Sequence, residues 1–458
     1  MAEILLHNLK LLESKESLSS AEYQIVDILI MTVSSLKEQN VIARIAGGWV
    51  RDKLLGLSSD DIDVSVENID GVSFANEMEK VIPKDKYPHF KIIENPEQSA
   101  HLSSARIQVF EEYQIDICGL RWDDYSNGSR IPVVSVGTLQ QDAMRRDFTI
   151  NCLFYNILDS RVEDLTGGID DLQNGILRTP QPTELSFKDD PLRILRAFRF
   201  ASRFNLQLDS LIIPSAQNAI QEYIAKVSPD RALQEVIKSL DGNNAIMFFQ
   251  WSIESGLFRH IFDPLNMWEL DEHEVFNRVS YCGNHSPNNN RHNIYLACIL
   301  FPIFEMPKVK DPSKKNSLVP ALEYAVIRGL KMTAHDYTMI STLIKGAQSY
   351  KNINHQLNRV SVGRFIMDIG EMWSYVKYIL FDDDEYTFFT DVFEKYVQEQ
   401  DLSTAYLMRP LMKGNDLAKA LNITNGKLIG DLLKNMLDWQ LENPNGNQFE
   451  YLEWKKTH

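Results

Sequence analysis

The hydrophobic pattern of the chain changes once, near residue 185. Before that point, apolar and polar residues alternate at Ile62 to Val66 and Tyr113 to Leu120, which predicts half-buried strands. A helical stretch, Glu22 to Leu36, precedes them. Later, the apolar spacing is helical almost to the end, as in Asp190 to Phe204, Pro229 to Leu240, Leu318 to Leu330 and Asp391 to Gln398. This order predicts a small α/β head followed by a long all-helical body.

Length and charge limit the class of protein. The 458 residues suggest about three structural units of ~150 residues. Lys and Arg number 47 and Asp and Glu 63, so the formal charge is −16. This excludes a globally basic nucleic-acid coat but not a local basic face, because phosphate binding needs positive charge only at the contact surface. Two turn-rich segments, Gly283 to Asn290 and Met306 to Asn316, are expected to be loops or linkers.

The cysteines indicate a reducing environment. Cys118, Cys152, Cys282 and Cys298 show no CxxC spacing and are too few for a disulfide scaffold. An intracellular location is expected, in the cytoplasm or nucleus, with the mitochondrion as a further option. The first twenty residues lack a signal-peptide layout and, without arginine, make a poor mitochondrial presequence. No apolar run approaches the ~20 residues that span a bilayer, so no membrane partner is expected.

A double glycine, Gly47-Gly48, is the strongest local motif. A strand-like run ends there and a helix is expected to begin, a junction that lets backbone and helix N-terminus approach a phosphate. Downstream, Asp61 and Asp63 stand two apart in an alternating run, so both carboxylates should point to one face of a strand. Adjacent carboxylates repel unless a cation lies between them, and a pair of Mg²⁺ ions is a usual solution. In isolation such acids are more often solvated; the upstream glycines favour the metal site.

Three further motifs follow in the first half of the chain. Asp116 lies in an alternating run, Gln114 to Cys118, which places it opposite its apolar neighbours. Arg145-Arg146-Asp147 precedes an aromatic and β-branched run, and alone it would predict a surface ion-pair cluster. Gly167-Gly168 is typical of either an ordinary turn or a hinge.

A helix with an arginine face is predicted after Asp189-Asp190-Pro191, because Asp before Pro is typical of a helix start. At 100° per residue, the arginines share one arc and apolar residues the opposite one. That arc contains Arg193, Arg196, Arg199 and Arg203. Four arginines without an interleaved acid suit phosphate groups better than a solvated face. The next motif, Ser228 to Glu235, predicts a capped structural helix without chemistry of its own.

In motif order and spacing, residues 40–240 resemble the nucleotidyltransferase superfamily of DNA polymerase beta. More narrowly, they resemble class II tRNA nucleotidyltransferases of eukaryotic type, the CCA-adding enzymes, and the related bacterial poly(A) polymerases. The resemblance implies two Mg²⁺ ions on Asp61 and Asp63, with Asp116 as the third catalytic carboxylate. With the arginine face, it predicts a nucleotide site of Gly47, Gly48, Arg51, Asp52, Arg145, Arg146, Asp147, Asp190, Arg193, Arg196 and Arg199.

The resemblance also implies how the nucleotide is chosen. Asp190 and Arg193 stand where the family has its protein template, and Asp189 replaces the more common Glu. Arg193 can donate to cytosine O2 and N3 or to adenine N1, while Asp190 accepts from the exocyclic amine. Uracil and guanine present a carbonyl oxygen where Asp190 needs a donor, which costs several kcal/mol in a desolvated pocket. The family further implies a hinge at Gly167 and Gly168. It also implies a mobile loop, Arg121 to Pro132, that helps to switch from CTP to ATP and contains Arg121 and Arg130.

The expected organisation is an α/β nucleotidyltransferase head over residues 1–160, followed by helical units in an extended multi-domain arrangement. These are a nucleotide-selecting neck over 161–240, a body over 241–350 and a tRNA-binding tail over 351–458. Pro307 to Lys351, with eight Lys or Arg and three Asp or Glu, is a candidate tRNA face or a solvated surface.

The implied reaction transfers CMP or AMP from CTP or ATP to the 3′ hydroxyl of tRNA, which is bound at its acceptor end and elbow. No stable protein partner is implied. Three alternatives remain open. The first is a partial enzyme that adds only CC, only the final A or a poly(A) tail. The second is a nucleotidyltransferase for small molecules, and the third is a non-catalytic tRNA-binding protein.

Overall fold

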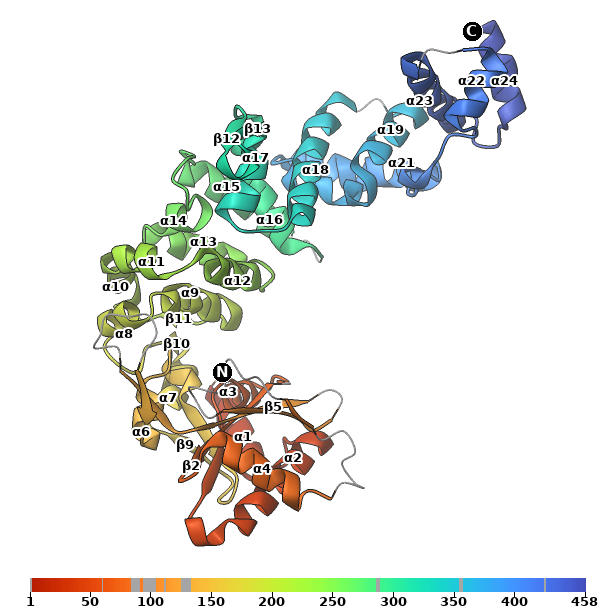
Figure 1. Ribbon diagram of the computed structural model, residues 1–458. Coiled ribbons are helices and arrows are strands. Elements are labelled where there is room, and N and C mark those ends of the chain that lie inside the picture. Colours follow the sequence, from red (N-terminus) through yellow and green to blue (C-terminus); the bar gives the residue numbers. More distant parts are fainter. Residues whose placement is uncertain are drawn as a thin grey trace. The chain divides into compact units, whose positions relative to one another are not determined.

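The computed structural model describes residues 2–59, 61–83, 91–93, 104–110, 113–124, 133–285, 289–353, 357–423 and 426–458. The chain forms two compact units, Met1–Leu257 and Phe258–His458. Unit 1 contains the sheet and the helices that follow it, and the described residues of unit 2 are mainly helical, with one short hairpin among them (Figure 1). This confirms the predicted α/β head followed by a mainly helical chain. The finer division into head, neck, body and tail stays a prediction.

The head of unit 1 is built on a seven-stranded mixed sheet, in the order β3-β4-β5-β2-β1-β8-β9. Its strands are β1 (Ile42–Ala46), β2 (Asp61–Glu67), β3 (Lys91–Ile93), β4 (Ala105–Gln108), β5 (Gln114–Gly119), β8 (Leu153–Asn156) and β9 (Arg161–Asp164). The helices with it are α1 (Ala2–Glu13), α2 (Ser20–Ser35), α3 (Gly48–Leu54), α4 (Gly71–Val81) and α6 (Leu139–Met144). Buried Glu22 ties α2 to α3, because its carboxylate accepts from the Trp49 indole at 2.9 Å and from Lys53 at 2.6 Å.

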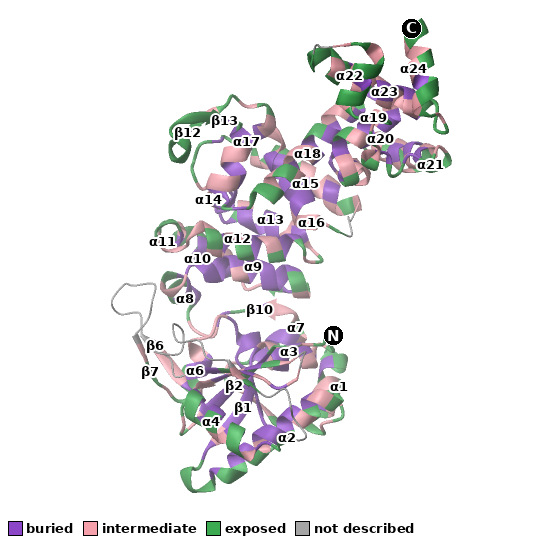
Figure 2. Ribbon diagram, turned by 45° about the vertical axis from the view of Figure 1, so that its right-hand side comes forward, coloured by how far each residue is buried: buried purple, intermediate pink, exposed green. Residues whose placement is uncertain are grey.

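Helices follow the sheet in unit 1. They are α7 (Gly168–Asn174), α8 (Thr183–Asp189), α9 (Leu192–Phe204), α10 (Ile212–Asn218), α11 (Ile220–Lys226), α12 (Pro229–Leu240) and α13 (Ala245–Glu254). The short strands β10 (Ile176–Leu177) and β11 (Gln207–Leu208) pair in parallel beside them. Helix α9 packs on both α12 and α13, and it is largely buried in Figure 2.

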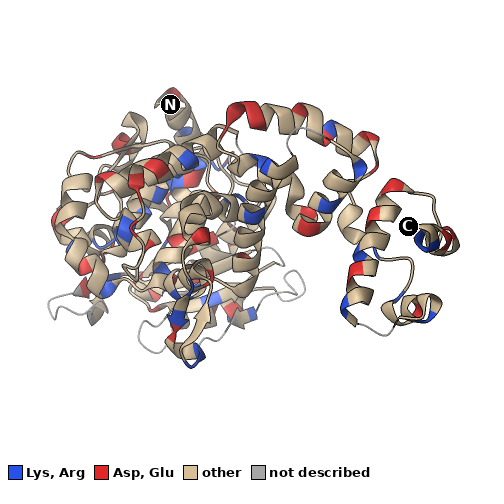
Figure 3. Cartoon of the chain, turned by 90° about the horizontal axis from the view of Figure 1, so that it is seen from above, with Lys and Arg blue, Asp and Glu red and all other residues tan. Residues whose placement is uncertain are grey.

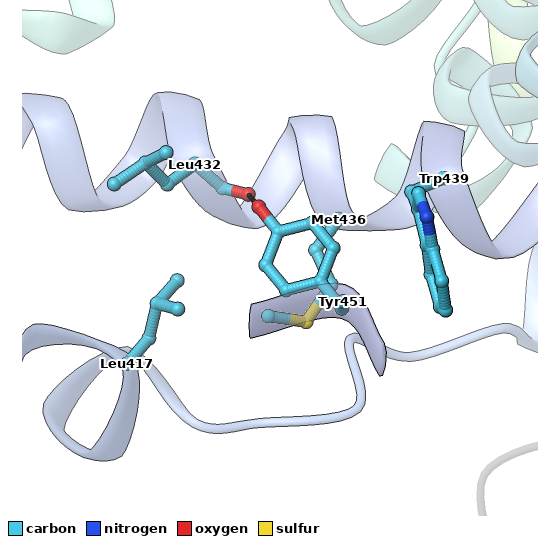
Figure 4. Close-up of a cluster of buried hydrophobic side chains, with 5 residues drawn as sticks. All are labelled: Leu417, Leu432, Met436, Trp439 and Tyr451. Atoms are coloured by element: carbon cyan, nitrogen blue, oxygen red, sulfur yellow. Dashed lines mark hydrogen bonds between the residues drawn. The ribbon is translucent and has the colours of Figure 1, made fainter. Parts of the chain in front are cut away.

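Unit 2 contains α14 (Phe258–Phe262), α15 (Glu272–His285), α16 (Arg291–Leu300), α17 (Ala321–Tyr324), α18 (Ala334–Tyr350), α19 (Arg359–Ile369), α20 (Asp383–Phe388), α21 (Glu394–Glu399), α22 (Gly414–Leu421), α23 (Gly426–Glu442) and α24 (Gln448–Thr457). Its last three helices share a core of Leu417, Leu432, Met436, Trp439 and Tyr451 (Figure 4). The buried Tyr451 hydroxyl in this cluster donates to the Leu432 carbonyl at 3.1 Å. None of the helices in the described ranges has the length and apolarity that crossing a membrane requires.

Two predictions within unit 2 are wrong. The segment Met306 to Asn316 is not simply a loop, and Leu318 is not helical. Instead, β12 (Val309–Asp311) and β13 (Ser317–Val319) form an antiparallel hairpin, and α17 begins only after Pro320. Proline disfavours a helical conformation in the residue before it, so the helix cannot extend back through Val319. The predicted loop from Gly283 begins inside α15 and runs partly outside the described residues.

Candidate functional site

Three carboxylates meet at the ends of two adjacent strands. In β2, Asp61 and Asp63 are exposed on one face, while Ile62 lies on the buried face. Strand β5 pairs with β2 in parallel, and its register sets Asp116 directly beside Asp63. The predicted common face of Asp61 and Asp63 is therefore found, and the proposed third carboxylate lies on the neighbouring strand.

The local electrostatics differ between these acids. Although Asp63 faces an open cavity, the surrounding protein desolvates it and raises its pKa, and Asp116 and Asp61 add repulsion while Arg146 opposes the shift. Asp116 accepts a two-pronged contact from the Arg106 guanidinium, at 2.6 and 2.7 Å. Within the described part of the chain, no three His, Cys, Asp or Glu side chains are gathered as a ready metal cage. The three carboxylates are close enough to repel one another, but Arg106 holds that of Asp116.

The double glycine allows a close approach. Gly47 has a φ of +72°, and a Cβ there would lie 2.9 Å from Nη1 of Arg146. Its backbone N–H donates to the Leu153 carbonyl at 2.8 Å, which fixes the end of β1 against β8. Gly48 begins α3, as predicted. A side chain at residue 47 would displace the arginine, so glycine is required at this junction.

Arg51 and Asp52 are buried and paired with each other. Nε of Arg51 donates to Asp52 at 2.8 Å, and Nη1 donates to the side-chain oxygen of Asn151 at 2.5 Å. The guanidinium also lies over the rings of Phe200 and Phe204, 5.1 and 4.5 Å from their centroids. Both residues line the cavity, but these contacts make Arg51 a brace between α3 and α9.

Asp142, which the sequence analysis missed, anchors both arginines of the Arg145-Arg146-Asp147 motif. It is fully buried, and its carboxylate accepts from Nε of Arg145 at 2.9 Å and from Nη2 of Arg146 at 2.9 Å. These cations hold the pKa of Asp142 below its usual value against the opposing effect of burial. The signal in the sequence was the spacing, since Asp142 near the end of α6 precedes Arg145 by three residues and Arg146 by four.

Asp147 is held by protein groups in this structure. Burial opposes its ionisation, but Arg196 at 2.6 Å and the Asn151 amide at 2.9 Å lower its pKa to about 2. Its Oδ1 also accepts from the backbone N–H of Phe148. Asp147 is thus a fixed anion that joins the loop after α6 to α9.

The arginine face of α9 is less open than predicted. Arg193 and Arg199 are each only 7% exposed. Arg193 donates to Ser186 at 2.8 Å and to the Arg145 carbonyl at 2.6 Å. Arg199 pairs with Glu235 of α12 at 2.5 Å, and Arg196 pairs with Asp147. The acids that neutralise this face come from other elements, so the sequence of α9 alone could not reveal them.

Asp190 lies just before α9, which begins at Leu192. Its Oδ1 accepts from the Leu192 backbone N–H at 3.3 Å, an interaction like the predicted cap. Its carboxylate also contacts Arg231 of α12 at 3.2 Å. Asp190 and Arg193, the pair predicted to select the base, therefore lie at the start of α9. Both are held by contacts from residues outside that helix.

The glycine pair 167–168 forms a tight helix start. Asp164 accepts from four successive backbone N–H groups, those of residues 166 to 169, at 2.9 to 3.1 Å. Gly167 has a φ of +81°, and a Cβ on Gly168 would lie 2.3 Å from the Thr149 carbonyl oxygen. These contacts favour an ordinary turn at this position. The hinge at Gly167 and Gly168 stays a prediction.

Arg121 is not in a loop. It belongs to β6 (Arg121–Asp124), which pairs with β7 (Val133–Val136). Arg130, which was predicted to belong to the same loop, lies outside the described residues. Residues Arg121–Asp124 pair with Val133–Val136 as antiparallel strands, so these residues are not loop, and the rest of the predicted loop lies outside the described residues.

One cavity of about 1210 Å³ collects most of these residues. Nine cationic side chains and seven carboxylates line it within the described residues. Of the predicted site, it is lined by Gly47, Gly48, Arg51, Asp52, Asp61, Asp63, Arg121, Arg145, Arg146, Asp147, Asp190, Arg193, Arg196 and Arg199. Asp116, Gly167 and Gly168 are not part of its lining. Such a cavity suits a polyanion that meets both arginines and a carboxylate-bound cation.

Comparisons with known proteins give a consistent picture. The poly A polymerase head domain family matches residues 43–178. The mitochondrial CCA tRNA nucleotidyltransferase of Candida glabrata is 31% identical, with 92% of this chain and 91% of that protein covered. The tRNA nucleotidyltransferase cca2 of Schizosaccharomyces pombe is 30% identical over 95% of this chain and 97% of that protein. Among solved structures, a Thermotoga maritima CCA-adding enzyme complexed with tRNA shares the fold, with a TM-score of 0.68, 20% identity and 97% of each chain covered.

Proposed function

The chain belongs to the family of CCA tRNA nucleotidyltransferases, and from this premise we propose that it adds C and A residues to the 3′ end of tRNA from CTP and ATP. The 3′ hydroxyl of tRNA attacks the α-phosphorus of the nucleotide, the bond to the β-phosphate oxygen breaks, and pyrophosphate leaves. The observation that carries the proposal is a single cavity lined by Asp61, Asp63, Arg145, Arg146 and Asp190.

Asp61 and Asp63 fit a Mg²⁺ site. They present hard oxygen ligands on one strand face, and desolvation together with neighbouring carboxylates raises the pKa of Asp63, an imbalance that a divalent cation would relieve. Asp116 could join them once Arg106 releases its carboxylate. Two Mg²⁺ ions bound there would supply activation of the 3′ hydroxyl and charge stabilisation of the pyrophosphate.

The remaining residues orient the nucleotide. Arg145 and Arg146, both held by Asp142, present guanidinium groups to the cavity, where they can donate in pairs to phosphate oxygens. Asp190 and Arg193 select the base by accepting from the exocyclic amine of C or A and donating to the ring edge. We also propose that Asp147 accepts a hydrogen bond from a ribose hydroxyl of the nucleotide. Because Asp147 is tied to Arg196 in this structure, one of its oxygens must then be shared.

The decisive experiment uses three tRNA transcripts that end at the discriminator base, at C and at CC. Each is incubated with Mg²⁺ and labelled CTP or ATP, and products are resolved at single-nucleotide length. Growth of all three to a defined CCA end establishes complete addition. Extension that stops at CC, or that occurs only on the CC substrate, identifies a partial enzyme. No extension of any transcript contradicts the proposal and favours a small-molecule transferase or a non-catalytic tRNA-binding protein.

The compartment is a separate question. The Candida glabrata relative is named as mitochondrial, and the proposal therefore includes the mitochondrion beside the cytoplasm and nucleus. Fractionation of cells that express the tagged protein tests this, and absence of the protein from purified mitochondria would remove that compartment.

A further inference from the structure

Arg231 contacts the carboxylate of Asp190 from the first turn of α12, although the two residues are 41 positions apart. Its Nη2 donates to both carboxylate oxygens, at 3.3 and 3.2 Å. The backbone N–H of Leu192 donates to Oδ1 at 3.3 Å. The carboxylate that we propose selects the base is therefore held in place from two sides.

Arg231 and Asp190 differ in their access to the cavity. Asp190 lines the cavity, whereas Arg231 is absent from the described residues that line it. The guanidinium thus contacts the carboxylate outside the cavity lining, and the lone pairs that it leaves unused remain for a ligand. From this position Arg231 cannot touch the base, but it can set the direction of the Asp190 carboxylate, which can.

The helix that carries Arg231 is itself fixed. Glu235 lies four residues further along α12, on the same face, and its buried carboxylate accepts from Arg199 at 2.5 Å. Helix α12 also packs along α9. Arg231 therefore reaches Asp190 from a rigid support, as positioning demands.

We propose that Arg231 is a positioning residue for nucleotide selection, acting through Asp190; the inference rests on the proposed function. An amine at the base edge donates to a carboxylate oxygen, whereas the carbonyl of uracil or guanine repels it. If the Asp190 carboxylate can rotate, it turns away from that carbonyl. The free-energy penalty for binding UTP or GTP then becomes smaller. Loss of Arg231 should therefore weaken rejection of UTP and GTP more than it slows transfer from CTP.

The test compares kcat/KM for CTP and UTP in the full-length protein, on a tRNA transcript that lacks CCA. Arg231→Met should lower the CTP-over-UTP ratio about ten- to a hundredfold, the scale of a misplaced contact group. Arg231→Lys should restore part of the ratio, because it keeps a donor near the carboxylate. Arg178→Met is the matched control, since Arg178 is half exposed and pairs with Asp209 at 3.2 Å away from the cavity. It should leave the ratio unchanged.

The outcomes separate this inference from the proposed function. If wild-type protein extends no tRNA, the proposed function fails. If wild-type protein is active and Arg231→Met slows CTP and UTP transfer equally, Arg231 is merely structural and the inference is overturned. Thermal unfolding is followed for every variant. Should Arg231→Met not fold, Arg231→Gln decides by the same ratio, where an unchanged value contradicts the inference and a lowered value supports it.

Discussion

Asp61 begins β2 and lines the cavity, and its replacement should be among the most damaging single changes. Asp61→Ala removes a proposed Mg²⁺ ligand, so nucleotide addition should fall by about a thousandfold or more. Binding of tRNA should stay nearly intact, because Asp61 is an acid and cannot itself hold a tRNA phosphate. Single-turnover extension and tRNA gel shifts measure the two effects. The exposed head residue Asp159 supplies the control, Asp159→Ala. Normal turnover in Asp61→Ala would refute the metal assignment.

Asp142 should matter for both folding and nucleotide binding. In Asp142→Asn, the partly buried Arg145 and Arg146 lose the buried charge that pairs them, which should cost about 3 to 5 kcal/mol of unfolding free energy. Urea unfolding measures this, and the KM for CTP should rise in parallel. Asp209→Asn breaks the half-exposed pair with Arg178 instead and should cost about 1 kcal/mol or less. Equal losses in the two variants would mean that Asp142 is no anchor.

Some of these residues were predictable and others were not. Alternation in β2 and β5 was sufficient to place Asp61, Asp63 and Asp116, because strand geometry fixes the face of each residue locally. The contact between Arg106 and Asp116 depends on how β4 registers against β5, which no local pattern encodes. Likewise, the pairing of Arg196 with Asp147 joins residues 49 positions apart.

At the scale of elements, the helix start at α7 offers a test of turn against hinge. Gly168→Ala would force a Cβ to 2.3 Å from the Thr149 carbonyl oxygen, so it should lower the free energy of unfolding by about 1 to 3 kcal/mol. Gly430→Ala is the control, because a Cβ at that exposed position within α23 meets nothing within 4 Å and should be neutral or stabilising by up to about 1 kcal/mol. If Gly168→Ala were as stable as wild type but slow in turnover, the hinge would be favoured.

The junction between the loop after α6 and helix α9 should show a specific pH dependence. In the folded protein the pKa of Asp147 is about 2, below the ~3.9 of an unfolded chain. Its ionised form therefore stabilises the fold above about pH 4, and this contribution disappears as the pH falls toward 2. The unfolding free energy of wild type should exceed that of Asp147→Asn by about 2 kcal/mol between pH 5 and 7. The difference should shrink below about pH 4; one that grew on acidification would contradict the assignment.

For the whole molecule, the charge is unevenly divided between the two units. Unit 2 carries 22 basic and 25 acidic residues, a net charge of −3, and unit 1 carries the remaining −13. Figure 3 shows basic and acidic residues interspersed along the helices. A polyanion must therefore be bound by local groups of cations, since the overall field repels it. The composition predicted this requirement, but the hairpin that groups several lysines was not foreseen.

That hairpin, β12 and β13, presents Lys308, Lys310 and Lys315 as exposed cations near its strands. Their neighbours Lys314 and Arg328 are instead paired with Glu323 and Asp311. If the three exposed lysines contact tRNA phosphates, their replacement by alanine should weaken tRNA binding and reduce the slope of log affinity against log salt by about 3.

Fluorescence anisotropy with labelled tRNA at several salt concentrations measures that slope. The matched control replaces three exposed lysines of the head, Lys10, Lys37 and Lys80, with alanine. Both triple variants change the net charge equally, so a long-range effect of charge would weaken binding alike in each. A loss confined to the hairpin variant, with unchanged discrimination between CTP and UTP, would place phosphate contacts on unit 2 and leave base selection to unit 1. An unchanged slope would mean that this basic segment is a solvated surface.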